Sequence, residues 1–233
     1  MNILAVGAHP DDIEFQCAGT LAKYVQRGDK VFVAVSTDGA AGTSRGTKEE
    51  TARTREQEVR RSAAILGAEV IWLGYPDEFL YEDETVRLRY IELVRQTRPD
   101  VIITHSPADY HTDHNETSRL VFDTSFLATV PLVVTERPVH DKVTPIYYMD
   151  TVAGLGFVPT EFVDITEVME TKEAMLRAHE SQLSWIKDHD DGDIVEQMKT
   201  VSAFRGQQCG VRYAEGFAAC LAALRCTTHR LLP

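Results

Sequence analysis

The sequence predicts an α/β protein with a Rossmann-like, doubly wound and mostly parallel sheet that carries helices on both faces. Two observations lead to this fold class: short apolar runs alternate with amphipathic stretches of helical length, and turn residues separate the two kinds of segment. Such alternation is typical of βαβ units, and right-handed crossovers then give the doubly wound arrangement. We expect residues 1–150 to form this core, and residues 151–233 to add a small C-terminal extension to the same single domain.

Strands and helices are predicted to alternate through the first two-thirds of the chain. The expected strands lie at residues 2–7, 31–36, 69–73, 101–104 and 146–150, and the expected helices at 17–27, 50–66, 84–97 and 114–129. Gly67 has the position of a residue that ends a helix, and Pro99 ends the next helix because the residue before a proline avoids the helical region. The last third is less regular, with a strand expected at 161–165 and helices at 167–182, 193–204 and 213–225.

Composition excludes several classes of protein. The 233 residues are 43% apolar, which is enough for one large domain with a substantial core. The formal charge of −12 argues against nucleic acid as a partner, because phosphate backbones are bound by clustered Lys and Arg. The sequence has no apolar run of the length that spans a membrane and no signal-peptide pattern, so we expect a cytoplasmic protein. The four cysteines are scattered and are expected to be reduced thiols.

The most informative segment follows the first predicted strand. Residues 8–12 read Ala-His-Pro-Asp-Asp, and residues at this end of a strand face the sheet edge where open α/β folds bind ligands. A histidine and two carboxylates placed there can hold a metal ion and still leave one carboxylate for proton transfer. We therefore expect His9 and Asp12 to bind a metal, with Asp11 as the general base.

A second segment can supply the missing ligand. His111, Asp113 and His114 follow the strand predicted at 101–104, so they fall at the same edge. One or both histidines can complete a site with three protein ligands, which leaves a fourth position for water as in catalytic zinc sites. The mixed His/Asp set favours Zn²⁺, although Fe²⁺ or another divalent transition metal fits the same ligands. The second histidine can polarise an oxyanion or protonate a leaving amine.

Together these segments resemble the PIG-L (LmbE-like) family of zinc-dependent de-N-acetylases. The similarity rests on the two motifs and extends to residues 55–58, 63–67, 98–102, 172–182 and 213–217. It implies hydrolysis of the N-acetyl group of an N-acetylglucosamine-type sugar conjugate, a small molecule, to acetate and a free amine. It also implies a homo-oligomer, a trimer or a hexamer.

The resemblance assigns roles to residues of both motifs. It places zinc at His9, Asp12 and His114. Asp11 would be the general base, and His111 would stabilise the oxyanion or act as the acid. Asp113 would orient His111 or His114, because ligating histidines generally need such a partner. Asp113 can equally cap the helix that begins near residue 115.

Three further residues are predicted to contact substrate. Arg55 falls where family members place an arginine near sugar hydroxyls, and Asp77 follows the third strand at the same sheet edge. Arg45 lies in a Ser-Arg-Gly-Thr segment that looks like that of members acting on N-acetylglucosaminyl malate, where it would bind a carboxylate. By contrast, His179 and Gln182 share one helix face, and we expect them to have a packing role.

Two other functions remain open. The chain can be an amidase that acts on a non-sugar N-acyl substrate in natural-product biosynthesis, because the same site would serve that reaction. It can also be a non-catalytic sugar- or nucleotide-binding module. No G-x-G-x-x-G follows the first strand, where dinucleotide-binding folds need it, and this disfavours the module.

Overall fold

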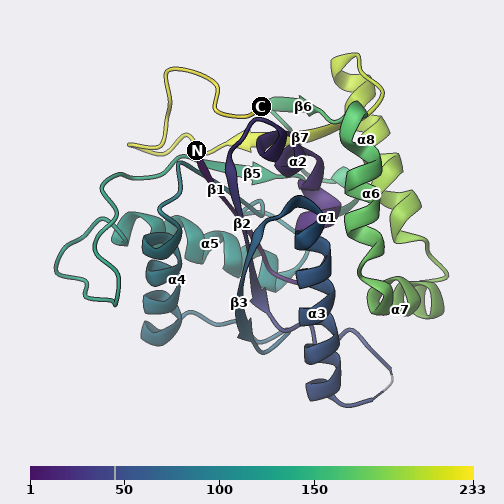
Figure 1. Ribbon diagram of the computed structural model, residues 1–233, viewed down its shortest axis with the longest axis horizontal. Helices are drawn as coiled ribbons and strands as arrows, with labels where there is room; N and C mark the ends of the chain where they lie inside the picture. The colour runs from purple at the N-terminus through teal and green to yellow at the C-terminus, as the bar shows by residue number, and fades with distance from the viewer. Residues whose placement is uncertain (45) are drawn as a thin grey trace.

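The computed structural model describes residues 1–44 and 46–233; Arg45 and the side chain of Asp190 lie outside the described residues. Within that part of the chain, seven strands form one sheet in the order β3-β2-β1-β4-β5-β7-β6 (Figure 1). Neighbours among the first five are parallel, which confirms the predicted α/β fold with a mostly parallel sheet. The strands are β1 (Asn2–Gly7), β2 (Lys30–Thr37), β3 (Glu69–Tyr75), β4 (Val101–Thr104), β5 (Ile146–Met149), β6 (Glu161–Asp164) and β7 (Ala214–Ala219).

The sheet reverses its winding direction between β1 and β4. From β1 the chain adds β2 and then β3 on one side, whereas β4 and β5 follow on the other side of β1. The loops that leave the carboxyl ends of β1 and β4 therefore diverge, and this is the point at which doubly wound sheets bind ligands. Residues 8–12 follow β1 and residues 111–114 follow β4, so both motifs lie at this point.

Helices cover both faces of the sheet, as its apolar strands require. Along β1, Ile3 and Ala5 pack into one core, and Leu4 and Val6 pack into the other. The second core is covered by α4 and α5, and the first by the remaining helices (Figure 1). None of the described helices is long and apolar enough to cross a membrane. The helices are α1 (Asp12–Gln16), α2 (Ala18–Gln26), α3 (Lys48–Leu66), α4 (Glu84–Thr97), α5 (Thr112–Leu127), α6 (Met169–Arg177), α7 (Glu180–Asp190) and α8 (Ile194–Cys209), with short 3₁₀ turns at Val152–Gly154 and Thr166–Val168.

Local signals set both ends of α3. The Thr47 hydroxyl accepts from the Glu50 N–H at 3.2 Å, and the Glu50 carboxylate accepts from the Thr47 N–H at 3.0 Å, which forms a capping box. Gly67, with φ 66°, ends the helix as predicted. These contacts are local in sequence, which is why this helix was predictable almost to its ends.

The prediction of a helix at 213–225 is wrong, because residues 214–219 form β7. This strand lies between β5 and β6 and is antiparallel to both. Its alanines favour a helix, but the two ladders and the complete burial of Phe217 outweigh that local preference. A Cβ at Gly216 would lie 3.0 Å from the Cβ of Pro159, so glycine allows the close approach of the neighbouring segment.

The helix predicted at 167–182 is divided into α6 and α7. His179 lies at the break with φ −90° and ψ 58°, and it is fully buried. The break turns α7 away from the direction of α6 and places it beside α3 (Figure 1). This turn positions one wall of the cavity described below.

A buried ion pair ties the C-terminal strands to the first helices. The Glu215 carboxylate of β7 accepts from the N–H groups of Gly19 and Thr20, at 2.9 and 2.7 Å, and it pairs with the Lys172 ammonium of α6. Both charged side chains are almost completely buried. Because removing one member of such a pair leaves a buried charge without its counter-charge, this pair is sensitive to substitution.

Replacing Lys172 by methionine (Lys172→Met) should lower the free energy of unfolding by about 3 kcal/mol, because Glu215 keeps its charge and loses its cation. Urea denaturation of the purified protein measures the loss. The matched control is Lys187→Met, at an exposed position of α7. If Lys172→Met lowers the free energy of unfolding no more than the control does, the N–H groups of Gly19 and Thr20 are sufficient to stabilise the buried Glu215 carboxylate.

Candidate active site

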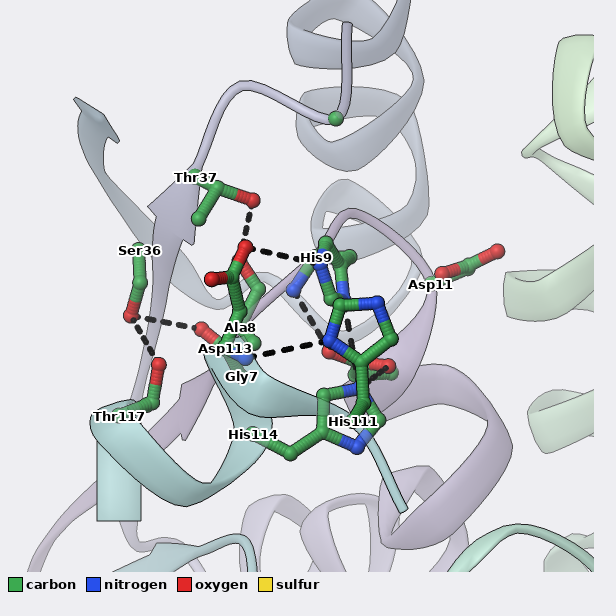
Figure 2. A network of polar contacts seen from close by, with 12 residues as sticks. Gly7, Ala8, His9, Asp11, Ser36, Thr37, His111, Asp113, His114 and Thr117 are labelled. Atoms are coloured by element: carbon green, nitrogen blue, oxygen red, sulfur yellow. Dashed lines mark hydrogen bonds and ion pairs between the residues drawn. The ribbon is translucent and has the colours of Figure 1, made fainter. Parts of the chain in front are cut away.

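Hydrogen bonds from β2 fix the start of the loop that follows β1. Thr37 donates from its N–H and its hydroxyl to the Ala8 carbonyl, at 2.8 and 2.9 Å. The Ser36 hydroxyl donates to the Gly7 carbonyl at 3.0 Å. Figure 2 shows these contacts to the left of His9. The loop that carries His9 is therefore held firmly at the edge of the sheet.

The turn into α1 separates the two aspartates of the first motif. The Asp12 carboxylate accepts from the His9 N–H at 2.6 Å and closes the turn. Asp11 has φ 104° and ψ −21°, a conformation that is uncommon for residues other than glycine and must be held by its surroundings. Arg55 supplies such support, since its Nη2 donates to the Pro10 carbonyl at 2.6 Å.

The amino end of α5 brings the second motif to the same place. The His111 Nδ1 accepts from the Asp113 N–H at 3.2 Å, so His111 caps this helix and Asp113 does not. The helix begins at Thr112, two residues before the predicted start at residue 114. His114 is buried, with its ring centroid 5.2 Å from that of His9 and 4.9 Å from that of His111.

Three polar atoms lie at the spacing of metal ligands. The His9 Nδ1 is 3.2 Å from the His114 Nε2 and 3.4 Å from the Asp12 Oδ2, and the His114 Nε2 is 3.3 Å from the Asp12 Oδ1. Ligands of a tetrahedral ion at about 2.0–2.1 Å lie about 3.3–3.4 Å from one another. The expected set of His9, Asp12 and His114 therefore fits one metal ion.

Carboxylates lie behind both imidazoles. The His114 Nδ1 is 3.2 Å from the Asp109 Oδ2, and the His9 Nε2 is 3.2 Å from the Asp77 Oδ1 and 3.5 Å from the Asp113 Oδ2. Each histidine presents one nitrogen to the centre and the other to a carboxylate, which is how metal-binding histidines are oriented. The Asp113 carboxylate thus faces His9 instead of His111 or His114. Sequence reasoning did not identify Asp109, which lies in an irregular segment without a distinguishing pattern.

His105 is a second residue that sequence reasoning missed. It is fully buried and stacks on His114 with ring centroids 4.0 Å apart. Its Nε2 accepts from the Ala8 N–H at 2.9 Å and lies 3.2 Å from the Asp12 Oδ2. Burial, reinforced by His114, lowers the pKa of His105 to about 4. The residue directly follows β4, and its position at that strand end was the available signal.

Potential ligand atoms in the described part of the chain form overlapping groups. These are His9 with His111 and His114, Asp12 with His105 and His114, and His9 with Asp77 and Asp113. A backbone N–H occupies the Nε2 of His105 and the Nδ1 of His111, and the His111 Nε2 faces the Glu78 Oε1 at 3.1 Å. Both histidines are therefore better placed to support or flank a metal ion than to bind it.

Burial opposes the charges of Asp12, His9 and His114, and for these three groups the attraction between opposite charges outweighs it. The pKa of Asp12 lies well below its usual range because His114, His105 and His9 surround it. In turn, Asp12 raises the pKa of His114 to about 9 and that of His9 well above its usual value. Ligating imidazoles are neutral, so a metal ion would displace protons from both histidines.

Asp11 faces Arg55 and not the histidines. Its Oδ1 lies 3.6 Å from the Arg55 Nη2, and Figure 2 shows its carboxyl to one side of the imidazoles. Burial raises the pKa of Asp11 to about 6; Arg55 opposes this rise and Asp12 adds to it. A carboxyl group with this pKa can accept a proton and return it near neutral pH.

Arg55 holds two loops together. Besides its bond to Pro10, its Nη1 donates to the Gly39 carbonyl at 2.9 Å. A Cβ at Gly39 would lie 2.5 Å from that nitrogen, and the φ of 62° independently favours glycine. The Arg55 Nε has no hydrogen-bond partner among the described residues. Contact between Arg55 and substrate stays a prediction, and the unbonded Nε is the nitrogen available for that contact.

Asp77 and Arg45 are the other two residues expected to contact substrate. Asp77 accepts from the Ala41 N–H at 2.8 Å through its Oδ2 and faces His9 through its Oδ1, so it orders both the loop and the imidazole. Its contact with substrate stays a prediction. Arg45 lies outside the described residues, and its expected contact with a carboxylate stays a prediction as well.

A cavity of about 420 Å³ joins these groups, a volume typical of ligand sites. One wall carries the two motifs together with Arg55 and Asp77. Another part of the lining comes from the end of α1, from α7 and from the start of α8, and it includes Gln16, Gln182 and Trp185. The packing role expected for Gln182 is therefore incomplete, because its side chain lines this cavity.

An ion pair between His179 and Glu14 supports the helix α1 that lines this cavity. The His179 Nε2 lies 3.1 Å from the Glu14 Oε1, which also accepts from the Ser62 hydroxyl at 2.6 Å. Burial lowers the pKa of His179, but Glu14, aided by Asp11 and opposed by Arg55, raises it overall above 6.5. The charged pair links the break between α6 and α7 to α1, directly beyond the aspartate motif.

Fold and site together define an α/β protein with a candidate metal centre at the switch point of its sheet. Residues 4–125 match the family described as GlcNAc-PI de-N-acetylase, PIG-L. The chain belongs to this family of metal-dependent de-N-acetylases, which confirms the resemblance drawn from the two motifs.

Relatives with named activities cover most of the chain. The diacetylchitobiose deacetylase of Thermococcus kodakarensis is 31% identical over 92% of this chain and 81% of its own length. A probable N-acetyl-α-D-glucosaminyl L-malate deacetylase of Bacillus anthracis is 30% identical over 78% and 82%. The solved 4-carboxy-2-hydroxymuconate hydratase of Pseudomonas putida superposes with a TM-score of 0.84 over 99% of this chain and 100% of its own. At 23% identity the hydratase shows the shared fold alone.

Replacing His179 by glutamine (His179→Gln) should destabilise the protein more at about pH 6 than at about pH 9, because a raised pKa gives stability that is present below the unfolded value and lost above the folded one. The free energy of unfolding of both proteins at the two pH values measures the effect. His229→Gln, at an exposed position near the end of the chain, is the control. An equal loss at both pH values would mean that His179 acts through packing and not through charge.

Proposed function

We propose that this protein hydrolyses the N-acetyl group of an N-acetylglucosamine-type sugar conjugate to acetate and a free amine. The carrying observation is the spacing of 3.2 to 3.4 Å between His9 Nδ1, His114 Nε2 and the two oxygens of Asp12, beside a carboxyl group that stays outside the set. Family membership and the named deacetylases support the same reaction.

The proposed metal is Zn²⁺, held by His9, Asp12 and His114. Two imidazole nitrogens and one carboxylate oxygen suit zinc, and Fe²⁺ is the alternative that the same donors accept. A divalent ion at this point supplies Lewis acidity for the acetamide carbonyl and makes water more acidic. The carboxylates of Asp109 and Asp77 favour this arrangement, because they fix the nitrogen that each imidazole turns to the centre.

Asp11 is the proposed general base. It lines the same cavity as the three ligands and is held next to Arg55, outside the ligand set. In this role its carboxylate takes a proton from the attacking water as the oxygen bonds to the acetamide carbon. The resulting tetrahedral centre breaks its carbon–nitrogen bond when the nitrogen receives a proton.

His111 is the proposed donor to the developing oxyanion. Because the His111 Nδ1 accepts from the Asp113 N–H, the proton of the neutral ring lies on Nε2, which points toward Glu78. If both ring nitrogens carried a proton, the Nδ1–H of His111 and the N–H of Asp113 would be two donors pointing at each other. This pattern makes Nε2 the nitrogen through which His111 donates a hydrogen bond. We therefore assign the return of the proton to the leaving amine to Asp11 and not to His111.

The same machinery would serve an amidase acting on a non-sugar N-acyl compound. The two relatives named above act, by their names, on amino-sugar substrates, which favours the sugar conjugate. We place the reaction in the cytoplasm, where the four cysteines, all present as free thiols, would stay reduced.

The substitution Asp11→Asn should lower kcat by about a thousandfold while the metal content stays near that of the unchanged protein, because the carboxyl group moves protons and does not bind the ion. Steady-state amine release from N,N′-diacetylchitobiose and elemental analysis of the purified protein measure the two quantities. His9→Ala and His114→Ala should instead lose the metal itself. Turnover of Asp11→Asn at the unchanged rate would rule Asp11 out as the base.

The substitution His111→Ala should lower kcat by about a hundredfold with little change in KM and with the metal retained, because its hydrogen bond strengthens only as the oxyanion forms. The same two measurements apply. His140→Ala provides a control histidine outside the cavity, whose activity per folded molecule should match that of the unchanged protein. A His111→Ala protein that loses its metal would show that His111 is a ligand.

A further inference from the structure

One wall of the cavity is built from uncharged side chains. Gln16 at the end of α1 and Gln182 and Trp185 on α7 line it, beside Ile186 and Ile194. None of these residues belongs to the machinery assigned above. The wall therefore faces the part of a substrate that does not react.

Two amide groups on this wall lack partners. Gln16 is only 3% exposed, and its Nε2 makes no hydrogen bond within the described residues. The Oε1 of Gln182 is also buried and makes no hydrogen bond within the described residues. It lies next to Gly42, because a Cβ placed on Gly42 would be 3.3 Å from it. Because buried polar groups are normally paired, an unpaired donor and an unpaired acceptor on one cavity wall indicate a ligand that carries both kinds of group.

Trp185 gives the same wall an aromatic surface. Its indole stacks on His189 with ring centroids 4.6 Å apart and lines the cavity. Aromatic and aliphatic surface combined with a few well-placed amides is the usual lining for an uncharged polar molecule such as a sugar. A carboxylate would instead require arginine, lysine or free backbone N–H groups.

Charge around the cavity also disfavours an anion. Asp11, Asp12, Asp77 and Glu78 line it, and apart from the histidines of the metal site Arg55 is the cationic side chain among the described lining residues. Both Nη atoms of Arg55 are bonded to carbonyl groups, and one of them faces Asp11. An acidic aglycone would therefore meet little compensating charge on this side.

We propose that Gln16, Gln182 and Trp185 form a subsite for an uncharged, hydroxyl-bearing aglycone, such as a second sugar unit, attached to the reacting acetamido sugar. The subsite selects neutral conjugates over acidic ones. This inference rests on the proposed function and adds to it the chemical class of the aglycone.

The position of α7 is fixed well enough for such selection. The Ser181 N–H and hydroxyl donate to the two oxygens of the buried Glu58 carboxylate, at 2.8 and 2.5 Å, which fastens the start of α7 to α3. The His179–Glu14 pair fixes the residue before it. Gln182 and Trp185 follow within the next two turns, so the wall is held in place before any ligand binds.

The experiment compares kcat/KM of the zinc-loaded protein for three probes: N,N′-diacetylchitobiose, N-acetylglucosaminyl malate and free N-acetylglucosamine. The neutral disaccharide should be preferred over each of the others by at least about tenfold. Trp185→Ala and Gln182→Met should each lower the ratio of disaccharide to monosaccharide at least about fivefold. Gln207→Met, at an exposed position of α8, and Phe126→Ala, on α5 away from the cavity, should keep the ratio of the unchanged protein.

Three results would decide against the subsite or separate it from the reaction. Equal or better turnover of the malate conjugate would overturn it, and a loss of that turnover in Arg45→Ala would locate the cation that the acidic aglycone uses. Ratios in Trp185→Ala and Gln182→Met that match the controls would also overturn it. If no probe is deacetylated, the proposed function fails; calorimetric binding of the disaccharide to Asp11→Asn protein, with and without Trp185→Ala, then decides the subsite by itself.

Discussion

The Asp12 carboxylate is the contact on which the rest of the site depends. One oxygen accepts from the His9 N–H and lies close to His9 and His105, and the other lies close to His114. This single group therefore sets the turn after β1, attracts imidazoles from two separate loops, and offers an oxygen to a metal ion. Its burial costs free energy that only surrounding positive charge or a cation can offset.

The cluster of charges is stable because backbone groups and the neighbouring strand hold each member from outside. Thr37 and Ser36 fix the carbonyls before His9, and the Asp113 N–H fixes the ring of His111. Arg55 connects the Pro10 turn to the loop at Gly39 and stands beside Asp11. The reacting groups are thus placed before substrate arrives, which is the condition for stabilising a transition state without reorganisation.

The C-terminal third of the chain completes the cavity with residues that lie outside the two motifs. The motifs at the ends of β1 and β4 carry the candidate metal ligands and the proposed base, while α7 and the start of α8 supply further residues of the cavity lining. The shared fold of a deacetylase-like chain and a hydratase shows that this architecture carries more than one reaction. Differences among family members in the aglycone are expected in this part of the lining, because it can change without disturbing the metal centre.

The sequence by itself determined the parallel core and pointed to the candidate metal ligands, because both arise from short stretches of chain. Strand patterns, the capping box at Thr47 and the motifs at His9 and His114 are local signals. Only the tertiary structure decided that residues 214–219 form a strand, that Asp113 faces His9, and that His105 and Asp109 support the site. These features depend on which distant segments meet. A contact across most of the length of the chain, such as that between the Gly19 N–H and the Glu215 carboxylate, leaves no local pattern in the sequence.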